Sequence, residues 1–552
     1  MTTPDDQQAN GLGESRPSDP TSPEPTVPIA TTGGRRGARR RVARLPVLVA
    51  IPAILAGFAA IDRVGAGDAA DADGTDASAS SASRSAAHRS LMPVAAPEGS
   101  LSSTWFCAGG TATDDGVADH TVVVANPGDE PVTAIVTIYP GALDTDPNAG
   151  QIADQPEVSE PLDVGARSRA TLRLGDVVDA PFAAALVEAP GGDIVVEHQV
   201  SSDRGTDTAP CASAASPTWY FAAGSTNRQA QELIVLFNPF PDDAVVDLTF
   251  ATPEGFRSPQ PYSGLIVPGE QVVALDATAV VARHDNLSAS IDARRGRVVA
   301  DRIQIYDGFR GRGIAVGLGQ PQLSELLFFP DGITGEGFTE RFMVFNPSDA
   351  PAQLDIEIYL DDPATNGEVE PVAVTVQPES HNAVELSGDP RIPSGVRHSA
   401  IVRVHNGVPV AAEQELFGEE PASARGVAVV AGSPLLADTW VLGAGEASEG
   451  IGELVTLFNP SLGEGISRVR IAALDGSGGD VPTLTDLEVQ PGGRLTIDLG
   501  EHLNRESLAL YVEATRPVVV ERLLFRRGGR GMSQALGVPL ARRIERPPAL
   551  TD

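Results

Sequence analysis

Apolar and polar residues alternate along most of the chain after residue 100, in short runs that end at Gly, Pro, Asn or Asp. Alternation with a period of two puts every second side chain on the same face, which is typical of half-buried β-strands. Residues 218–239, TWYFAAGSTNRQAQELIVLFNP, show the recurring outline: an aromatic strand start, a polar turn, an apolar run and a closing Asn-Pro. Related stretches begin at Trp105, Phe328 and Trp440. The chain therefore repeats one structural unit.

The closing Asn-Pro dipeptides set the length of this unit. They lie 112, 108 and 113 residues apart, at Asn126, Asn238, Asn346 and Asn459. All three tryptophans, Trp105, Trp219 and Trp440, open a copy, and Phe328 is expected to take their place in the remaining one. This regularity predicts four tandem modules over residues 101–216, 217–324, 325–436 and 437–541, followed by a tail over residues 542–552. We call them modules 1 to 4.

Each module is predicted to be an all-β, immunoglobulin-like antiparallel β-sandwich. Seven or eight short alternating runs are separated by turn signals about every ten residues, as such sandwiches require. The last two runs of each copy flank a tight turn and are expected to form a hairpin; these turns are Gly191-Gly192, Arg295-Gly296, Asn406-Gly407 and Arg516-Pro517. No linker separates the copies, so we expect a stiff row of contacting modules. A propeller is less favoured, because its blades repeat at about half this length.

The segment before the modules has a different composition. Residues 1–44 are rich in Pro, Ser, Thr, Asp and Gly and end in a cluster of six arginines, which predicts a disordered cytoplasmic tail. The uncharged run from Leu45 to Ile61 predicts a transmembrane signal anchor, and residues 62–100 a low-complexity Ala/Ser/Asp linker. We therefore expect a single-pass membrane protein with extracellular modules. The alternative is a signal peptide cleaved near Val64-Gly65-Ala66, which would give a secreted protein.

Charge and composition exclude several functions. The net charge is −34 and the pI about 4.5, which argues against a nucleic-acid partner because phosphate binding requires a basic surface. The sequence contains no lysine, so Lys-dependent nucleophiles and a P-loop lysine are excluded. The eight histidines are scattered, and no metal-binding or nucleophile motif accompanies them. We therefore expect no enzymatic activity and no cofactor, and a hydrolase is the least favoured function.

The two cysteines, Cys107 and Cys211, bracket module 1. Their spacing does not fit a structural zinc site. In an exported protein, a disulfide joining the two ends of one domain is the favoured interpretation.

Some polar and aromatic positions recur in every module. Glu197, Asp301, Glu413 and Glu521 lie near the end of the penultimate strand. They are either four ligand sites or structural groups that accept backbone or arginine hydrogen bonds across their own sheet, and recurrence in every copy favours the structural interpretation. The tryptophans are expected to fill the core or module contacts in preference to stacking on sugars. Each Asn of the Asn-Pro pairs is expected to bond backbone groups where its strand ends.

These motifs together resemble a known family. A WYFAxG start, a strand ending in Asn-Pro, a V-x-P-G turn, a V-V-x-E-R run and a Gly-rich close are similar to the repeats of the actinobacterial DUF5719 family, over about residues 101–541. Module 1 departs from the pattern by carrying cysteine, and module 3 by having FFPDG. The resemblance implies a membrane-anchored, extracytoplasmic protein and supplies no catalytic residues.

Two functions follow as expectations. The first is a non-enzymatic cell-surface structural or adhesion protein that displays its repeats toward envelope polymers or partner proteins. The alternative is an array of carbohydrate-binding modules that assists envelope glycan assembly, which requires exposed aromatic side chains.

Overall fold

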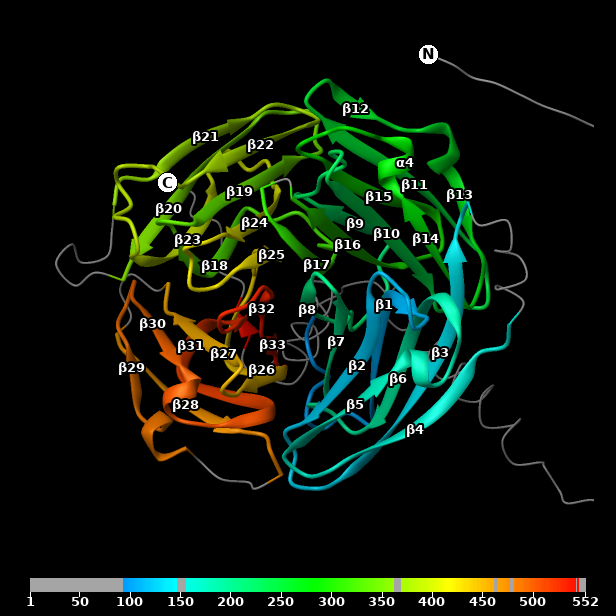
Figure 1. The fold of residues 1–552 in the computed structure, drawn as a ribbon. Coiled ribbons are helices and arrows are strands. Elements are labelled where there is room, and N and C mark those ends of the chain that lie inside the picture. The colour runs from blue at the N-terminus through cyan, green and yellow to red at the C-terminus, as the bar shows by residue number, and fades with distance from the viewer. Residues whose placement is uncertain are drawn as a thin grey trace, which may run out of the picture. The chain divides into compact units, whose positions relative to one another are not determined.

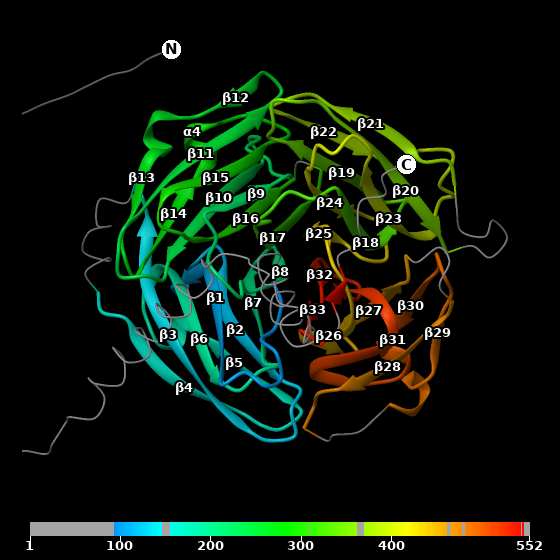
Figure 2. The same cartoon turned by 180° about the vertical axis from the view of Figure 1, so that it is seen from behind.

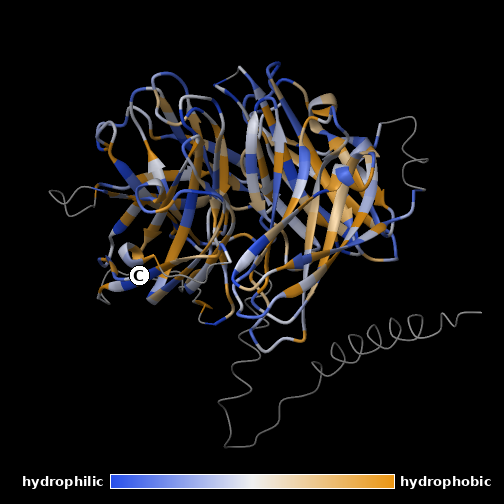
Figure 3. Cartoon of the chain, turned by 60° about the horizontal axis from the view of Figure 1, so that its bottom comes forward, coloured by the Kyte–Doolittle hydropathy of each residue, from blue (hydrophilic) through white to orange (hydrophobic). Residues whose placement is uncertain are grey.

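The computed structural model of the chain describes residues 93–145, 155–308, 310–361, 369–460, 465–476, 481–542 and 544–545. These residues are mostly β-strand, which confirms the predicted all-β class. Hydrophobic residues lie mainly on the strands and hydrophilic residues on the connecting loops (Figure 3). The predicted cytoplasmic tail and membrane anchor lie outside the described residues. Within the described part of the chain, no helix has the length and hydropathy needed to cross a membrane.

The same succession of strands recurs in each module (Figure 1). Module 1 contains β1 (Ser102–Ala112), β2 (Asp119–Asn126), β3 (Val132–Leu143), β4 (Val158–Val164), β5 (Ser168–Arg173), β6 (Ala180–Pro190), β7 (Val195–Ser202) and β8 (Gly205–Pro210). Module 2 contains β9 (Thr218–Phe221), β10 (Ala230–Asn238), β11 (Ala244–Thr252), β12 (Gly255–Arg257), β13 (Ser263–Val267), β14 (Gln271–Asp276), helix α4 (Ala277–Val280), β15 (Ser288–Arg295), β16 (Val299–Asp307) and β17 (Arg312–Leu318).

Module 3 contains β18 (Leu326–Ile333), β19 (Phe338–Asn346), β20 (Ala352–Leu360), β21 (Val372–Val376), β22 (Ser380–Glu385), β23 (Arg397–Val404), β24 (Ala411–Gly418) and β25 (Gly426–Ala431). Module 4 contains β26 (Leu436–Ala447), β27 (Ile451–Phe458), β28 (Ser467–Ala473), β29 (Leu487–Val489), β30 (Arg494–Asp498), β31 (Arg505–Arg526) and β32 (Met532–Leu536), followed by β33 (Val538–Pro539) and β34 (Ile544–Glu545). Short 3-10 turns lie at Leu174–Asp176, Gln260–Tyr262, Pro482–Leu484 and Leu499–Glu501.

Each module is built from two sheets whose apolar faces meet. In module 1 the first sheet has the order β4-β3-β6-β1 and the second the order β5-β2-β7-β8. The corresponding strands of modules 2, 3 and 4 pair in the same order. Val136 and Val187 of the first sheet share one buried cluster with Val122 and Val196 of the second. The period-two pattern therefore encodes the inner faces of both sheets.

The hairpin predicted at the end of each copy is wrong. β6 pairs with β1 and β3, whereas β7 pairs with β2 and β8, so the turn between β6 and β7 carries the chain from one sheet to the other. In module 4 the single long strand β31 joins both sheets, with Arg516-Pro517 in its interior. Two adjacent runs with apolar faces can bury them across a sandwich as well as within one sheet, and the sequence pattern is the same for both.

This crossover also changes the strand order. In a constant-type immunoglobulin domain the third, sixth and seventh strands share one sheet. Here the sixth strand, β6, lies beside the third, β3, but the seventh, β7, lies in the opposite sheet. The hairpin that does form joins β7 to β8.

The modules are joined in a closed arrangement, not in the expected row (Figures 1 and 2). The described residues all belong to one compact unit. Within it, β14 of module 2 pairs in parallel with β3 of module 1, and module 4 returns to contact module 1. The last strands of the modules contact one another in turn: β8 with β17, β17 with β25, β25 with β32, and β32 with β8. Each module therefore has two neighbours.

The end of the predicted linker belongs to this folded unit. Val94 and Ala95 are buried, and the Ala95 amide donates a hydrogen bond to the Pro539 carbonyl oxygen over 3.0 Å. Ala95 and Leu540 also form a parallel β-bridge. The two ends of the described chain therefore lie side by side, and they help to hold module 1 against module 4.

Candidate functional site

The four recurring carboxylates lie at the boundaries between modules. Glu197, Asp301, Glu413 and Glu521 are on β7, β16, β24 and β31, and each is at most 2% exposed. Each accepts one or two backbone hydrogen bonds from the opening segment of the preceding module. Asp301, for example, accepts from the amides of Ala108 and Gly109 in module 1, over 3.0 and 3.2 Å. We call these four residues the interface carboxylates.

The same contact recurs at the other boundaries. Glu413 accepts from the Ala223 amide of module 2, and Glu521 from the Asp331 amide of module 3 over 2.8 Å. Glu197 of module 1 accepts from the Gly443 and Ala444 amides of module 4, over 3.0 and 2.8 Å. The preferred interpretation of these carboxylates specified backbone hydrogen bonds, but it placed them within one sheet. The hydrogen bonds instead connect neighbouring modules.

The opening motif of each module supplies the donors for these bonds. The first strand shifts register between Cys107 and Gly110, and again between Phe329 and Gly332 and between Leu442 and Gly445. Such irregularities free backbone amides from the sheet ladder and turn them outward. The WFCAGG, FFPDG and WVLGAG segments therefore form docking points for the next interface carboxylate.

A second set of four buried polar residues, one in each module, was missed by sequence reasoning. It lies six residues before each Asn-Pro asparagine and consists of His120, Glu232, Glu340 and Glu453, all fully buried. The glycine that ends the opening motif makes room for it, because a Cβ on Gly224 would lie 2.4 Å from Glu232 Oε2 and one on Gly445 2.7 Å from Glu453 Oε1. The signal in the sequence was a polar residue at a fixed position of an otherwise apolar strand.

Arginine neutralises the interface carboxylate at two boundaries. The Arg302 guanidinium of module 2 donates to both carboxylate oxygens of Glu413, over 2.8 and 3.2 Å. Arg522 of module 4 donates to Glu197 over 3.1 Å. Both arginines directly follow an interface carboxylate in the sequence and are 1% exposed. A buried charge that loses its partner is strongly destabilising, so these pairs hold the modules in one relative position.

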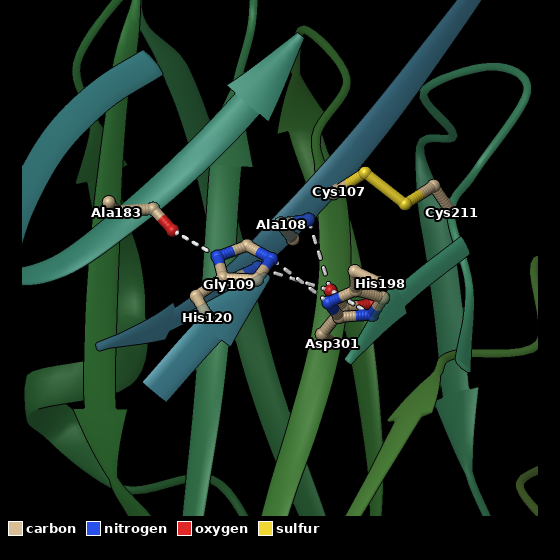
Figure 4. Close-up of a disulfide and its surroundings, with 8 residues drawn as sticks. All are labelled: Cys107, Ala108, Gly109, His120, Ala183, His198, Cys211 and Asp301. Atoms are coloured by element: carbon tan, nitrogen blue, oxygen red, sulfur yellow. Dashed lines mark hydrogen bonds and ion pairs between the residues drawn. A yellow bond between two sulfur atoms is a disulfide. The ribbon is translucent and has the colours of Figure 1, made fainter. Parts of the chain in front are cut away.

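Histidines replace these charges between modules 1 and 2 (Figure 4). His198 Nε2 lies 3.5 Å from Asp301 Oδ2, and His198 Nδ1 lies 3.1 Å from His120 Nε2. His120 Nδ1 is 2.9 Å from the Ala183 carbonyl oxygen. Burial lowers the pKa of His120 to about 4 and raises the pKa of Asp301 to about 8. Burial therefore favours the uncharged form of each of these two side chains.

The disulfide lies beside this cluster. Cys107 and Cys211 are bonded, and both side chains are buried (Figure 4). The bond closes a loop with a sequence separation of 104 residues and joins the first strand of module 1 to the segment leading into module 2. It therefore restrains module 1 where the next module begins.

Between modules 3 and 4 the contact combines amide hydrogen bonds with the buried ion pair of Arg494 and Asp331. Gln414 Nε2 donates to Glu340 over 2.6 Å, and Gln534 Nε2 donates to the Gln414 amide oxygen over 3.2 Å. Gln534 also donates to the Asp331 carbonyl oxygen over 2.8 Å. Burial, followed by the charge of Asp331, raises the pKa of Glu521 well above its usual value.

These buried acids predict a dependence of stability on pH. Burial raises the pKa of Glu232 to about 8 and that of Glu453 to about 7. The folded state therefore binds more protons than the unfolded state above pH 4.5, and the free energy of unfolding should fall as pH rises toward 8. The buried histidines have lowered pKa values and act in the opposite direction only below about pH 6.5.

We expect the melting temperature of the wild-type chain to fall between pH 6.5 and 8.5. The Glu232→Gln variant should show a smaller fall, because its amide does not ionise. Glu449→Gln, which changes an exposed side chain, serves as the matched control. Parallel melting profiles for Glu232→Gln and wild type across this range would contradict the assignment.

The tryptophans fill the module cores. Trp105, Trp219 and Trp440 are at most 1% exposed. Their indole N–H groups donate to carbonyl oxygens where the chain enters the second sheet after the crossover: Ile194, Val298 and Val518. The carbohydrate-binding alternative required exposed aromatics, and these three tryptophans do not meet that requirement.

Phe328 does not occupy the tryptophan position. Leu327 does, because it pairs with Val402 as Trp105 pairs with Val187, and it lies in the core of module 3. Phe328 points to the other face and packs into the buried cluster of module 4. The expected position is one residue too far along the chain, because it follows from aromatic character and not from strand register.

The side chains of the Asn-Pro asparagines connect three segments of the chain through hydrogen bonds to backbone groups. The Asn238 side-chain amide donates to the carbonyl oxygens of Asp242 and Val267, and its oxygen accepts from the Phe240 amide. Asn126, Asn346 and Asn459 make corresponding side-chain bonds to the following loop and to the turn after the fourth strand of their modules. This position is structural in each module, as expected.

The boundary between modules 4 and 1, which we call the seam, contains a cavity of about 510 Å³. One wall is the outer face of the β5-β2-β7-β8 sheet of module 1, with Thr121, Arg169 and Gln199. Module 4 supplies the opposite wall, including Glu446 and Phe525. Among the described residues, no group of three or more His, Cys, Asp or Glu side chains is placed to hold a metal ion.

Comparison with known proteins gives one family. No curated protein matches the chain. One solved structure, titled "Crystal Structure of Thermotoga maritima 1070", aligns with 20% sequence identity over 20% of this chain and 94% of its own, with a TM-score of 0.17. Residues 188–314 and 310–545 match the family described as "Family of unknown function (DUF5719)", which spans more than half of the 552 residues. The chain belongs to the DUF5719 family.

Proposed function

We propose that this protein is a non-enzymatic structural or adhesion protein of the cell surface, which presents its modules toward envelope polymers or partner proteins. The observation that carries the proposal is the use of the recurring polar residues. Each interface carboxylate is buried and accepts a backbone hydrogen bond from the preceding module. Asp301 of module 2, for example, accepts from module 1, and Glu197 of module 1 accepts from module 4. These residues stabilise one assembly of modules, and the loops are left to meet a partner.

The placement outside the cell is supported by two features. The uncharged run from Leu45 to Ile61 follows six arginines, as in an anchor whose N-terminal side remains in the cytoplasm. The Cys107–Cys211 disulfide fits an oxidising compartment. Ala95, near the start of the described chain, pairs with Leu540 of module 4. A membrane anchor before residue 93 would therefore attach to the folded unit where modules 1 and 4 meet.

Thiol labelling and protease treatment of intact cells test the placement. Without reductant, Cys107 and Cys211 should resist labelling in denatured chain from the envelope, and they should react after reduction. External protease should remove an epitope placed after residue 545 but not one placed at residue 1. Free thiols, or protection of both epitopes, would contradict an extracytoplasmic protein.

Binding tests the role. The purified full-length chain is incubated with isolated envelope polysaccharide and, separately, with envelope protein extract, and heat-unfolded chain is the control. Retention by either material, lost on unfolding, is expected. If the folded chain is retained by neither, the proposed role fails.

The carbohydrate-binding alternative is supported by the seam. The seam cavity is lined by polar side chains at a boundary where the outer sheet face of module 1 meets module 4. This observation favours a ligand site between modules in preference to one site within each module.

A further inference from the structure

The seam differs in chemistry from the equivalent boundaries. In every module, the residue two positions after the interface carboxylate pairs with a residue on the neighbouring strand of the second sheet. The side chains of this cross-strand pair lie toward the preceding module. In module 2 this pair is Leu233 and Ile303, and both side chains are buried. In module 4 it is Leu454 and Leu523. In module 3 it is Arg341 and Glu415, a buried ion pair with 2.5 Å between Nε and Oε2.

Module 1 departs from all three. Its pair is Thr121 and Gln199, and both side chains line the seam cavity. On the neighbouring strand, Arg169 and Thr171 of β5 stand where β14 of module 2 has Val272 and Ala274, as the registers Asn126↔Ser168 and Asn238↔Gln271 establish. At these two positions β30 of module 4 has Arg494 and Thr496, so module 1 is distinguished by its cross-strand pair. That pair is apolar or an ion pair in the other modules and is polar and uncharged here.

The open volume fits a small ligand. The cavity of about 510 Å³ lies within the 300–1,000 Å³ that ligand pockets usually occupy. Arg169 is anchored across the seam, because its Nε donates to Ser507 Oγ over 2.7 Å and its Nη1 to the Gly443 carbonyl oxygen over 3.2 Å. The polar wall is thus held in place by contacts to module 4.

The lining chemistry indicates a polyhydroxy compound. Hydroxyl groups of Ser202, Thr206 and Ser533 and the Gln199 amide offer both donors and acceptors. Three arginines and three carboxylates line the cavity, so their formal charges offset and neither an anion nor a cation is favoured. The Phe525 ring adds an apolar face of the kind that packs against a sugar ring.

We propose that the seam between modules 4 and 1 binds a neutral saccharide segment. This inference rests on the proposed function and assigns the chemical class of the envelope polymer and the place where it binds. Hydroxyl groups of the sugar exchange hydrogen bonds with the polar face of module 1, and its apolar ring face lies toward Phe525. Among the described residues, the other three boundaries are filled at the same strand positions, so the Thr121 and Gln199 wall of this site does not recur there.

Isothermal titration calorimetry with the full-length chain tests the site. Chitotriose and cellotriose are the neutral saccharide probes, digalacturonate is the acidic probe and trialanine the peptide probe. At least one neutral saccharide should bind. The double variant Thr121→Leu/Gln199→Ile, which introduces the residue types of module 2, should weaken that binding at least tenfold. Thr137→Leu on the other sheet of module 1, outside the cavity, should leave it unchanged.

A second, smaller change keeps the site testable if the double variant does not fold. Thr171→Val removes one hydroxyl from an exposed position of the cavity wall and should weaken binding by a smaller factor. Neutral-saccharide binding that survives in both seam variants would overturn the site. Binding of none of the probes, or of digalacturonate or trialanine alone, would overturn the ligand class. If envelope polysaccharide retains wild type and both seam variants equally, the inference fails and the proposed function stands; if neither polysaccharide nor protein extract retains the chain, the proposed function itself fails.

Discussion

Replacing Glu413 by alanine should destabilise the folded chain by about 3–5 kcal/mol, the usual cost of removing one partner of a buried ion pair. Arg302 would keep its charge with 1% exposure and without the two hydrogen bonds that it donates to Glu413. The Ala223 amide would also lose its acceptor. Urea unfolding followed by circular dichroism measures the shift of the midpoint.

Two further variants separate the charge from the loss of side-chain volume. The double variant Arg302→Leu/Glu413→Leu removes both charges together and should be more stable than Glu413→Ala. Asp486→Ala removes a partner of the exposed Arg468 and should leave the midpoint nearly unchanged, because exposed pairs contribute little. Equal midpoints for Glu413→Ala and wild type would show that the contact between modules 2 and 3 does not depend on this pair.

Trp219→Ala should cost about 3–5 kcal/mol, as for other buried tryptophans cut to alanine. Trp219 is fully buried, and its indole N–H satisfies the Val298 carbonyl oxygen over 2.9 Å. The variant therefore leaves a void and removes one of the two hydrogen bonds that the Val298 oxygen accepts, the other being from the Ser216 amide. Thermal unfolding of the full-length chain, followed by far-ultraviolet circular dichroism, measures the loss.

Module 3 provides the matched control for this position. Trp219→Leu introduces the residue type that Leu327 supplies there, and it should cost less than Trp219→Ala because more of the volume is kept. Neither variant should change saccharide binding if the seam is the ligand site. A stable Trp219→Ala protein that has lost saccharide binding would instead restore the tryptophans as a sugar-binding platform.

The repeat, the strand positions and the local closures could be predicted from the sequence. Asn238 shows why: it acts on the backbone of Phe240 and Asp242, a few residues away, so its role depends on a short segment. The alternation of β11, Ala244–Thr252, likewise follows from having one buried and one outer face. Hydrogen-bonding reach and strand geometry are local properties, and a local pattern carries them.

The partners of each module were decided only by the tertiary structure. The same alternating runs fit a hairpin or a crossover between sheets, and β6 and β7 form the crossover. Asp301 was recognisable as a buried structural carboxylate, but its donors at Ala108 and Gly109 lie 193 and 192 residues away in another module. No local pattern encodes such a distance.

The sequence by itself determined four copies of one β unit, the cysteine pair and the strand-closing asparagines. The tertiary structure decided that the copies close on one another, that Leu327 and not Phe328 fills the core of module 3, and that Thr121 and Gln199 of module 1 line a cavity at the seam. Equivalent strand positions face the preceding module in every copy. Whether the side chains at these positions pack tightly or line a cavity therefore depends on the module opposite them. Only the closed arrangement of the modules decides which module that is.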